Sequence, residues 1–194
     1  MTTIRFLAHA RARTHTGAHT RAHTNHHTKF FVPPKSAASP PKRRLAVRTS
    51  GIHGKGVFAL RDFAEGETLI EYLGEVITWQ EAQVRHPHDP ANPNHTFYFH
   101  IDDTRVIDGL HQGNAAKWIN HSCDGNCEAD EVRGRIFIKA LRNIQAGEEL
   151  TYDYGLVTDE PLTRKLKAEY PCWCGSKHCR GTMLAPKRAA WRKR

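Results

Sequence analysis

The stretch 117-KWINHSCDGNCEA-129 places an Asn-His pair one residue before a cysteine, at the end of a short apolar run. The chain has five cysteines, and three of them follow about fifty residues later in a C-x-C-x4-C spacing: Cys172, Cys174 and Cys179. Thiolates so close in sequence are typical of a Zn²⁺ site, which needs a fourth ligand to complete a closed tetrahedron. Cys123 can supply that ligand. The alternative is three unpaired thiols with His178 as an incidental neighbour.

A metal at these cysteines would fasten the C-terminal segment beside Asn120 and His121, so that a ligand of this pair would lie beneath a lid. A reducing compartment favours a metal over disulfides. No apolar run is long enough to span a membrane, and the start MTTIRFLAHARAR lacks the apolar core of a secretory signal. We therefore expect an intracellular protein without membrane contact. An organelle-targeting presequence is the alternative, because residues 1–44 contain Arg and no acid.

The formal net charge of +9 is unevenly distributed along the chain. Residues 1–44 hold nine Lys and Arg, and residues 187–194 hold five. All 20 acidic residues and the other 15 basic ones lie between residues 45 and 186, which leaves that body with a net charge of −5. Basic tails can contact nucleic acid nonspecifically, or they can merely aid solubility. The acidic body is expected to attract a basic, Lys- or Arg-rich protein or peptide.

Composition predicts one domain with tails. Residues 1–44 carry His-Thr pairs at His15, His19, His23 and His27, followed by prolines, and we expect a disordered basic tail there. A helix with a weak metal-binding face, or an extension from a mistaken start codon, is the alternative. The main domain is expected over 45–158, a linker helix with the cysteine segment over 159–184, and a basic C-terminal tail over 185–194.

Short runs rich in β-branched and aromatic residues, separated by turn residues, predict a mainly β fold with few helices. The expected strands lie within 45–50, 56–60, 68–77, 96–101, 105–108, 135–141 and 149–154. Thr78 and Glu81 form a capping box for a short helix that ends before Pro87. One or two helical turns are expected in 113–119, and Pro161 is expected to open a helix of about nine residues.

Two segments resemble each other, 60-LRDFAEGETL-69 and 141-LRNIQAGEEL-150. Each places a Gly-Glu turn ahead of an expected strand. We interpret them as two similar hairpin entries with a structural role, not as two active sites.

Six motifs occur in the order of a known family: 54-GKG-56, 71-EYLGEVI-77, 97-FYF-99, 114-NAAKWINHSCDGNC-127, 147-GEELTYDYG-155 and the C-terminal cysteines. Each is weak alone, but together and in order they are highly specific. From about residue 45 to residue 184 the chain resembles the SET-domain protein lysine methyltransferases that carry a post-SET zinc segment.

This resemblance implies a β-clip fold with knot-like C-terminal threading and a zinc-bound lid. It also implies methyl transfer from S-adenosylmethionine to a lysine ε-amine of a basic, histone-like or other Lys-rich protein. It identifies Tyr154 as the catalytic tyrosine, Tyr72 as a second hydroxyl at the transfer pore, and Phe99 and Tyr152 as walls of the substrate channel. The residues implied to contact S-adenosylmethionine are Gly54, Lys55, Gly56, Phe97, Asn120, His121 and Trp173.

The chemistry of the channel follows from the substrate. A free lysine has a pKa of about 10.4, so presenting its amine uncharged near neutral pH costs about 4 kcal/mol. A dry aromatic channel lowers this cost because it disfavours the charged form. Tyr152 stands where family members carry Phe or Tyr, and its hydroxyl leaves less room for a methylated amine, which predicts mainly mono-methylation.

A different reading is a SET fold without turnover, recruited to nucleic acid or chromatin by its basic tails. The tyrosines Tyr72 and Tyr154 and the pair Asn120 and His121 favour an enzyme. A zinc-finger-like DNA reader is excluded, because the cysteine segment lacks the helix and paired ligands of such modules. The family suggests a cytoplasmic location for a bacterial protein, and a nuclear or chromatin-associated one for a eukaryotic protein or one exported to a host.

Four residues depart from the family pattern. Phe97 stands where many relatives have a tyrosine that contacts the cofactor. Gly125 replaces a usual proline and Trp118 a common phenylalanine, changes that we interpret as packing differences. Cys127 has no expected partner and is predicted to be a buried thiol.

Overall fold

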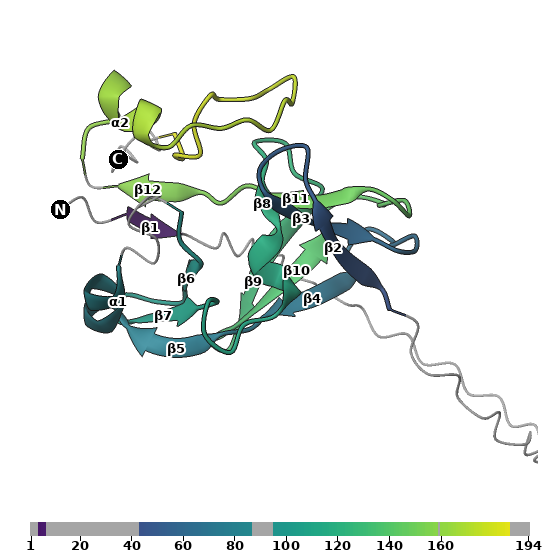
Figure 1. Cartoon of the computed structure of the whole chain (residues 1–194), viewed down its shortest axis with the longest axis horizontal. Coiled ribbons are helices and arrows are strands. Elements are labelled where there is room, and N and C mark those ends of the chain that lie inside the picture. The colour runs from purple at the N-terminus through teal and green to yellow at the C-terminus, as the bar shows by residue number, and fades with distance from the viewer. Residues whose placement is uncertain (1–3, 7–42, 87–94, 159, 187–194) are drawn as a thin grey trace, which may run out of the picture.

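The computed structural model describes residues 4–6, 43–86, 95–158 and 160–186 (Figure 1). Within these ranges the chain is mainly β, as the sequence predicts. The strands are β1 (Ile4–Phe6), β2 (Leu45–Thr49), β3 (Lys55–Ala59), β4 (Thr68–Tyr72), β5 (Glu75–Thr78), β6 (Tyr98–His100), β7 (Arg105–Asp108), β8 (Asn120–His121), β9 (Cys127–Val132), β10 (Arg135–Ala140), β11 (Glu149–Tyr152) and β12 (Leu156–Thr158). The helices are α1 (Trp79–Arg85), the 3₁₀ helix η1 (Ala115–Trp118) and α2 (Arg164–Glu169).

The strands of the described ranges form three sheets. The largest runs in the order β2-β3-β11-β9-β10-β4, with β8 added beside β11, and the others are β5-β7-β6 and β1-β12. Strand β11 pairs in parallel with both β8 and β9, so the segment from His121 to Cys127 passes around its end. A Cβ atom at Gly125 would lie 2.6 Å from the Thr151 carbonyl oxygen, so glycine lets this segment lie against β11. The segment between β8 and β9 therefore packs closely against the end of β11.

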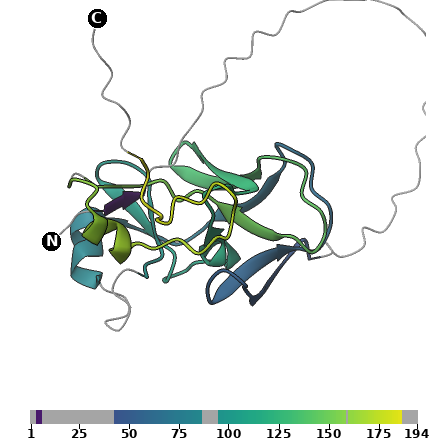
Figure 2. The same ribbon diagram turned by 90° about the horizontal axis from the view of Figure 1, so that it is seen from above.

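The core lies between the large sheet and η1. Its fully buried side chains include Val57, Ile119, Ile136, Ile138 and Leu150. A second apolar cluster lies under α1, and a third holds α2 against β12. The segment from α2 to the last cysteine lies as a separate layer over the region of β8 and β11 (Figures 1 and 2).

The predicted capping box is confirmed. The Thr78 hydroxyl accepts a hydrogen bond from the Glu81 backbone N–H at 3.2 Å, and the Glu81 carboxylate accepts one from the Thr78 N–H at 2.9 Å. Helix α1 ends at Arg85, two residues before Pro87. The prediction that Pro161 opens α2 is wrong. The helix starts later, because the Thr163 hydroxyl caps it by accepting from the Leu166 N–H at 3.1 Å.

Four strands, β1, β8, β9 and β12, lie outside the predicted set. The β9 sequence, 127-CEADEV-132, contains three acidic residues, which are poor strand formers. It forms a strand because it pairs along its whole length with β10. The two-residue turn between them, Arg133 and Gly134, has positive φ at both residues, which matches the right-handed twist of a hairpin.

The two similar segments around Phe63 and Ile144 interlock. The backbones of these two residues exchange hydrogen bonds of 2.8 and 2.9 Å. Each segment also accepts a backbone N–H from the other through a side chain: Asp62 from Ala146 at 2.8 Å, and Asn143 from Glu65 at 3.0 Å. The repetition in the sequence therefore serves the structure, as we expected.

The N-terminal segment differs at one place from the expectation of disorder. Residues 4–6 form β1, which pairs antiparallel with β12. The His-Thr repeats and the C-terminal residues 187–194 lie outside the described residues. Within the described ranges, no helix combines the length and the apolar character needed to cross a membrane.

Candidate active site and metal centre

A cavity of about 530 Å³ lies between the loop around Gly54, the start of β8 and the segment that carries Trp173. Its lining includes six of the seven predicted cofactor contacts: Gly54, Lys55, Phe97, Asn120, His121 and Trp173. Gly56 is not part of the lining. A side chain there would collide with the Glu149 carboxylate, so this glycine makes room for an internal contact.

The Asn120 side chain holds the glycine loop in place. Its amide nitrogen lies 2.9 Å from the Lys55 carbonyl oxygen, 3.1 Å from that of His53, and 2.9 Å from the Glu149 carboxylate. The Ser50 hydroxyl donates to the same carboxylate at 2.7 Å. These bonds tie the loop to β8 and β11, so Asn120 shapes one wall of the cavity.

His121 links the cavity to the cysteines. Its Nδ1 accepts a hydrogen bond from the Tyr154 backbone N–H at 3.1 Å, and its Nε2 lies 3.4 Å from the Cys123 sulfur. Burial lowers the pKa of His121 to about 4, so the ring is neutral near pH 7. Because Nδ1 accepts, the single ring proton resides on Nε2 and points toward the sulfur.

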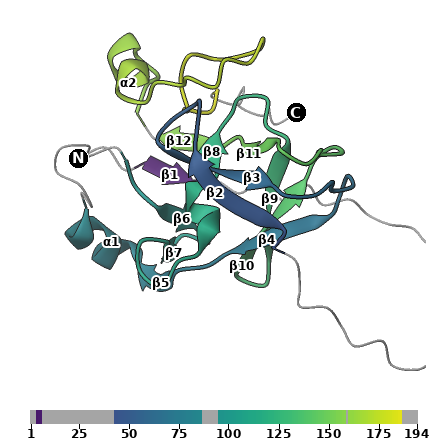
Figure 3. The ribbon, with the colours of Figure 1, turned by 45° about the vertical axis from the view of Figure 1, so that its right-hand side comes forward.

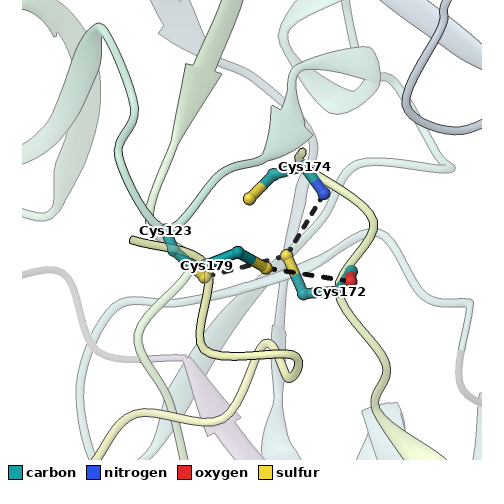
Figure 4. A group of neighbouring side chains, drawn as sticks. All are labelled: Cys123, Cys172, Cys174 and Cys179. Atoms are coloured by element: carbon teal, nitrogen blue, oxygen red, sulfur yellow. Dashed lines mark hydrogen bonds between the residues drawn. The ribbon is translucent and has the colours of Figure 1, made fainter. Parts of the chain in front are cut away.

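The four predicted zinc ligands meet, although 49 residues separate Cys123 from Cys172 (Figure 4). Their sulfur atoms all lie within 4.8 Å of one another, and those of Cys123 and Cys172 are 3.7 Å apart. A tetrahedral zinc with Zn–S bonds of about 2.3 Å requires sulfur separations of about 3.8 Å. A disulfide would require about 2.05 Å. The donor set therefore fits one zinc ion and excludes a Cys123–Cys172 disulfide.

Backbone groups support the same centre. The Arg180 N–H donates to the Cys123 sulfur at 3.3 Å, and the Gly181 N–H donates to the Cys179 sulfur at 3.3 Å. The Cys174 N–H lies 3.5 Å from the Cys172 sulfur. Burial raises the pKa of the Cys123 and Cys172 thiols, and the N–H groups of Arg180 and Cys174 oppose part of this rise.

Cys127 lies apart from this cluster, as predicted. It is 1 % exposed, and burial raises the pKa of its thiol to about 12.

Four aromatic rings form a continuous row, which we call the aromatic row: Tyr72, Phe99, Tyr152 and Tyr154. Successive ring centroids are 5.0, 6.3 and 4.9 Å apart. The Tyr72 hydroxyl donates to the Phe97 carbonyl oxygen at 2.8 Å, and the Tyr154 hydroxyl donates to that of Ile119 at 2.8 Å. Since each proton is already donated, the oxygen lone pairs are what these two hydroxyls can offer a ligand.

Burial raises the pKa of all three tyrosines in the aromatic row. They therefore remain protonated at neutral and mildly alkaline pH. Tyr154 belongs to this row and also lines the cavity, so the two parts of the site meet there.

Comparison with known protein families identifies the architecture, because the family model described as the SET domain matches residues 54–155. The chain belongs to the SET-domain family. It is 40 % identical over 143 residues to the histone-lysine N-methyltransferase trithorax of Drosophila virilis. It is 39 % identical over 145 residues to the H3 lysine-4 specific histone-lysine N-methyltransferase of Saccharomyces cerevisiae, and 41 % identical over 143 residues to human histone-lysine N-methyltransferase 2B.

Each of these alignments covers 72 % of the chain. The matched region is a small part of each relative: 4 % of the Drosophila virilis protein, 13 % of the yeast protein and 5 % of the human protein.

Sequence reasoning missed an ion pair between Asp153 of the SET domain and Arg180 of the cysteine segment. The two terminal guanidinium nitrogens of Arg180 donate to the carboxylate, at 2.7 and 2.8 Å. Burial opposes ionisation of Asp153, but Arg180 outweighs it and holds the pKa of the carboxyl below its usual range. Asp153 lies between two tyrosines of the aromatic row and Arg180 follows Cys179, so the pair joins the lid to the strand. The sequence contains no signal that these two charges meet.

The sequence predicted only some of the basic and aromatic residues that line the cavity. The Lys55 ammonium lies 4.7 Å from the centre of the Trp118 ring, and that of Lys117 lies 5.4 Å from it. Trp173, whose surface is 61 % exposed, stacks on His53 at a centroid distance of 6.0 Å and an interplanar angle of 13°. This stack brings the lid into contact with the glycine loop across the cavity mouth.

Proposed function

We propose that the chain transfers a methyl group from S-adenosylmethionine to a lysine ε-amine of a basic, histone-like protein. The observation that carries the proposal is the position of Tyr154, which is shared by the cavity and the aromatic row. A donor molecule in the cavity and a lysine along the row would meet at this residue. The names of the relatives, histone-lysine N-methyltransferases, support the same reaction and a histone as substrate.

The cavity suits the donor in shape and chemistry. Its volume falls within the range of small-molecule sites. Gly54 has φ of +50°, and nothing lies within 4 Å of where its Cβ would stand, so a ligand can approach the backbone closely. When bound, S-adenosylmethionine supplies the methyl group on a positively charged sulfonium. We assign its binding to Gly54, Lys55, Asn120, His121, Trp173 and, as an apolar contact, Phe97.

The aromatic row has two tasks. Tyr72, Phe99 and Tyr152 are each less than 7 % exposed, so they exclude water and disfavour an ammonium ion in their midst. The lysine therefore gives its proton to solvent before it reacts. The lone pairs of Tyr154 and Tyr72 accept hydrogen bonds from the neutral amine and orient it for in-line attack. Neither tyrosine acts as a general base, because both keep their protons.

The zinc centre is structural in this proposal. Cys123, Cys172, Cys174 and Cys179 would hold the ion with four thiolates, which would leave no open position for chemistry. Bound there, the ion would fix the segment that contains Trp173 over the cavity. We assign residues 45–158 to the SET domain and 159–184 to the linker helix and post-SET segment, and we propose a role at chromatin.

The product is proposed to be mainly mono-methyllysine. Tyr152 lies in the row between Phe99 and Tyr154, and burial keeps its hydroxyl protonated. A hydroxyl there occupies space and binds a water or the amine, so a methylated amine has less room to rotate.

Labelled S-adenosylmethionine with histone H3 tests the proposal, followed by mapping of the modified lysine. We expect Tyr154→Phe to reduce kcat by about 10²- to 10³-fold, as for loss of an orienting polar group, with cofactor affinity within about threefold of wild type. Tyr98→Phe is the matched control. It removes a buried hydroxyl that donates to a backbone carbonyl, that of Ala82, in the separate cluster under α1.

Normal turnover in Tyr154→Phe would show that the hydroxyl is misassigned. Absence of transfer to any lysine, in histones and in a cell extract, would favour a SET fold that binds without catalysis.

A further inference from the structure

The backbone N–H of Tyr154 donates to a side chain. Tyr154 lies between the end of β11 and the start of β12, outside both strands, and its N–H donates to Nδ1 of His121 at 3.1 Å. The parallel pairing of β8 with β11 ends at His121 and Tyr152, so the imidazole adds one bond beyond that pairing. Strand β8 lies beside β11, with the C-terminal segment, in yellow, above them (Figures 1 and 3).

The other end of the same imidazole meets the four-cysteine centre. Nε2 of His121 lies 3.4 Å from the sulfur of Cys123, one of the four cysteines in Figure 4. A backbone N–H can only donate, so Nδ1 accepts from Tyr154 and the proton of the neutral ring is on Nε2. The Asp153 carboxylate lies 3.7 Å from Nδ1, beyond hydrogen-bond distance. Nε2 therefore donates to the sulfur, in a side chain that is only 4 % exposed.

The ring and hydroxyl of Tyr154 contact the same short segment. The hydroxyl donates to the Ile119 carbonyl oxygen at 2.8 Å, and the phenol ring packs edge to face against the imidazole of His121, with centroids 5.2 Å apart. A shift of His121 would therefore move the hydroxyl in the cavity that both residues line. Misplacement of a catalytic group by about 1 Å can reduce a rate about 100-fold.

We propose that His121 is a positioning residue that connects metal binding at the four-cysteine centre to the placement of Tyr154. With zinc bound, the Cys123 sulfur is an anionic acceptor in a fixed position, and the bond from Nε2 then fixes the ring. Nδ1 thereby stays aimed at the Tyr154 N–H. The inference rests on the proposed function for the role of the Tyr154 hydroxyl, and it gives the His121 side chain a task besides contact with the donor.

A second connection runs in parallel, through Arg180. Its N–H donates to the Cys123 sulfur, and its guanidinium group pairs with Asp153, the residue before Tyr154. This route ends on a side chain that is 41 % exposed, whereas the route through His121 ends on the backbone of Tyr154 itself. Variants of Arg180 and of His121 therefore distinguish the two routes.

Two substitutions in the full chain separate the two bonds of His121. The side-chain nitrogen of Gln can take the place of Nε2, so His121→Gln keeps a donor for Cys123 and loses the acceptor for Tyr154. The side-chain oxygen of Asn can take the place of Nδ1, so His121→Asn keeps the acceptor and loses the donor. The Kd for zinc, measured by competition with a chromophoric chelator, should stay within about threefold of wild type in His121→Gln and rise about tenfold in His121→Asn.

His178→Asn is the matched control. It makes the same change at an exposed histidine beside Cys179, and it should leave the zinc Kd at the wild-type value. An equal loss of zinc affinity in His121→Gln and His121→Asn would indicate a structural role alone and overturn the proposal.

Hydrogen exchange of the Tyr154 amide, followed by NMR, measures the connection without turnover. Removal of zinc from wild type with a chelator should increase the exchange rate about tenfold. In His121→Gln the amide should exchange equally fast with and without zinc, and in Arg180→Ala the full response should remain. A wild-type amide that does not respond to zinc would overturn the proposal. A response that is lost in Arg180→Ala and kept in His121→Gln would do the same, because the connection would then run through Asp153.

Kinetics complete the test. At saturating zinc, His121→Gln should lower kcat about tenfold, with the KM for a histone H3 tail peptide within about twofold of wild type. A wild-type kcat in this variant would refute the positioning of Tyr154 by His121. If the Tyr154 amide responds to zinc as expected in a chain that methylates no lysine, the connection is supported and the proposed function is refuted.

Discussion

The ion pair between Asp153 and Arg180 is expected to hold the zinc lid against the strand that carries Tyr154. The pair is bidentate, with N···O distances of 2.7 and 2.8 Å, and it connects the residue after Tyr152 to the residue after Cys179. Arg180→Ala removes this connection. The backbone N–H of Arg180, which contacts Cys123, is retained, so we expect the variant still to bind one zinc ion per chain.

The size of the effect follows from geometry and exposure. Hydrogen bonds to charged groups contribute about 1.5–3 kcal/mol each when well shielded. The side chains of Asp153 and Arg180 are 41 % and 24 % exposed, so solvent screens the pair. We reduce the total to about 1–2 kcal/mol for this reason. If lid closure is coupled to binding of S-adenosylmethionine, the Kd should rise about 5- to 30-fold.

A double-mutant cycle with Asp153→Ala and Arg180→Ala isolates the pair, with calorimetric measurement of the Kd and metal analysis of each variant. A control cycle uses Arg142 and Glu148, which lie 2.9 Å apart before β11 and are 56 % and 30 % exposed, and it should give a coupling below about 0.5 kcal/mol because the pair lies within one turn and does not involve the cysteine segment. The reasoning is refuted if the Asp153–Arg180 coupling is no larger than the control while every variant retains its zinc.

Three further predictions concern the product, the metal and pH. Tyr152→Phe should increase di- and trimethyllysine in mass spectra, and an unchanged product distribution would contradict the steric role of its hydroxyl. Wild type should contain about one zinc per chain, and Cys174→Ala should lose both metal and activity; full activity without zinc would remove the lid from the mechanism. Because burial raises the pKa of Tyr72, Tyr152 and Tyr154, the unfolded chain releases their protons above about pH 10 while the folded chain retains them. Stability should therefore fall by up to about 4 kcal/mol per pH unit above pH 10, and a flat unfolding free energy between pH 9 and pH 11 would argue against the burial of these hydroxyls.

Local features were predictable from the residues alone. The capping box at Thr78 depends on two side chains that are three residues apart. The three cysteines from Cys172 to Cys179 also lie within one short segment, so their spacing can be read directly. The short runs of β-branched and aromatic residues predicted most strands, and the order of the motifs identified the SET domain. Such signals are readable because the interacting groups are near neighbours in the chain.

Long-range pairings were decided by the tertiary structure. Strand β9 forms despite its acidic residues because β10 lies beside it, and Asp153 meets Arg180 because the lid folds back over β11. The pairing of β1 with β12 joins segments about 150 residues apart. In each case a charge or a strand edge has many partners of suitable chemistry, and only the path of the backbone selects one of them. The sequence therefore determined the family, the candidate metal-binding cysteines and the capping box at Thr78, while the folded chain determined which surfaces meet around Tyr154.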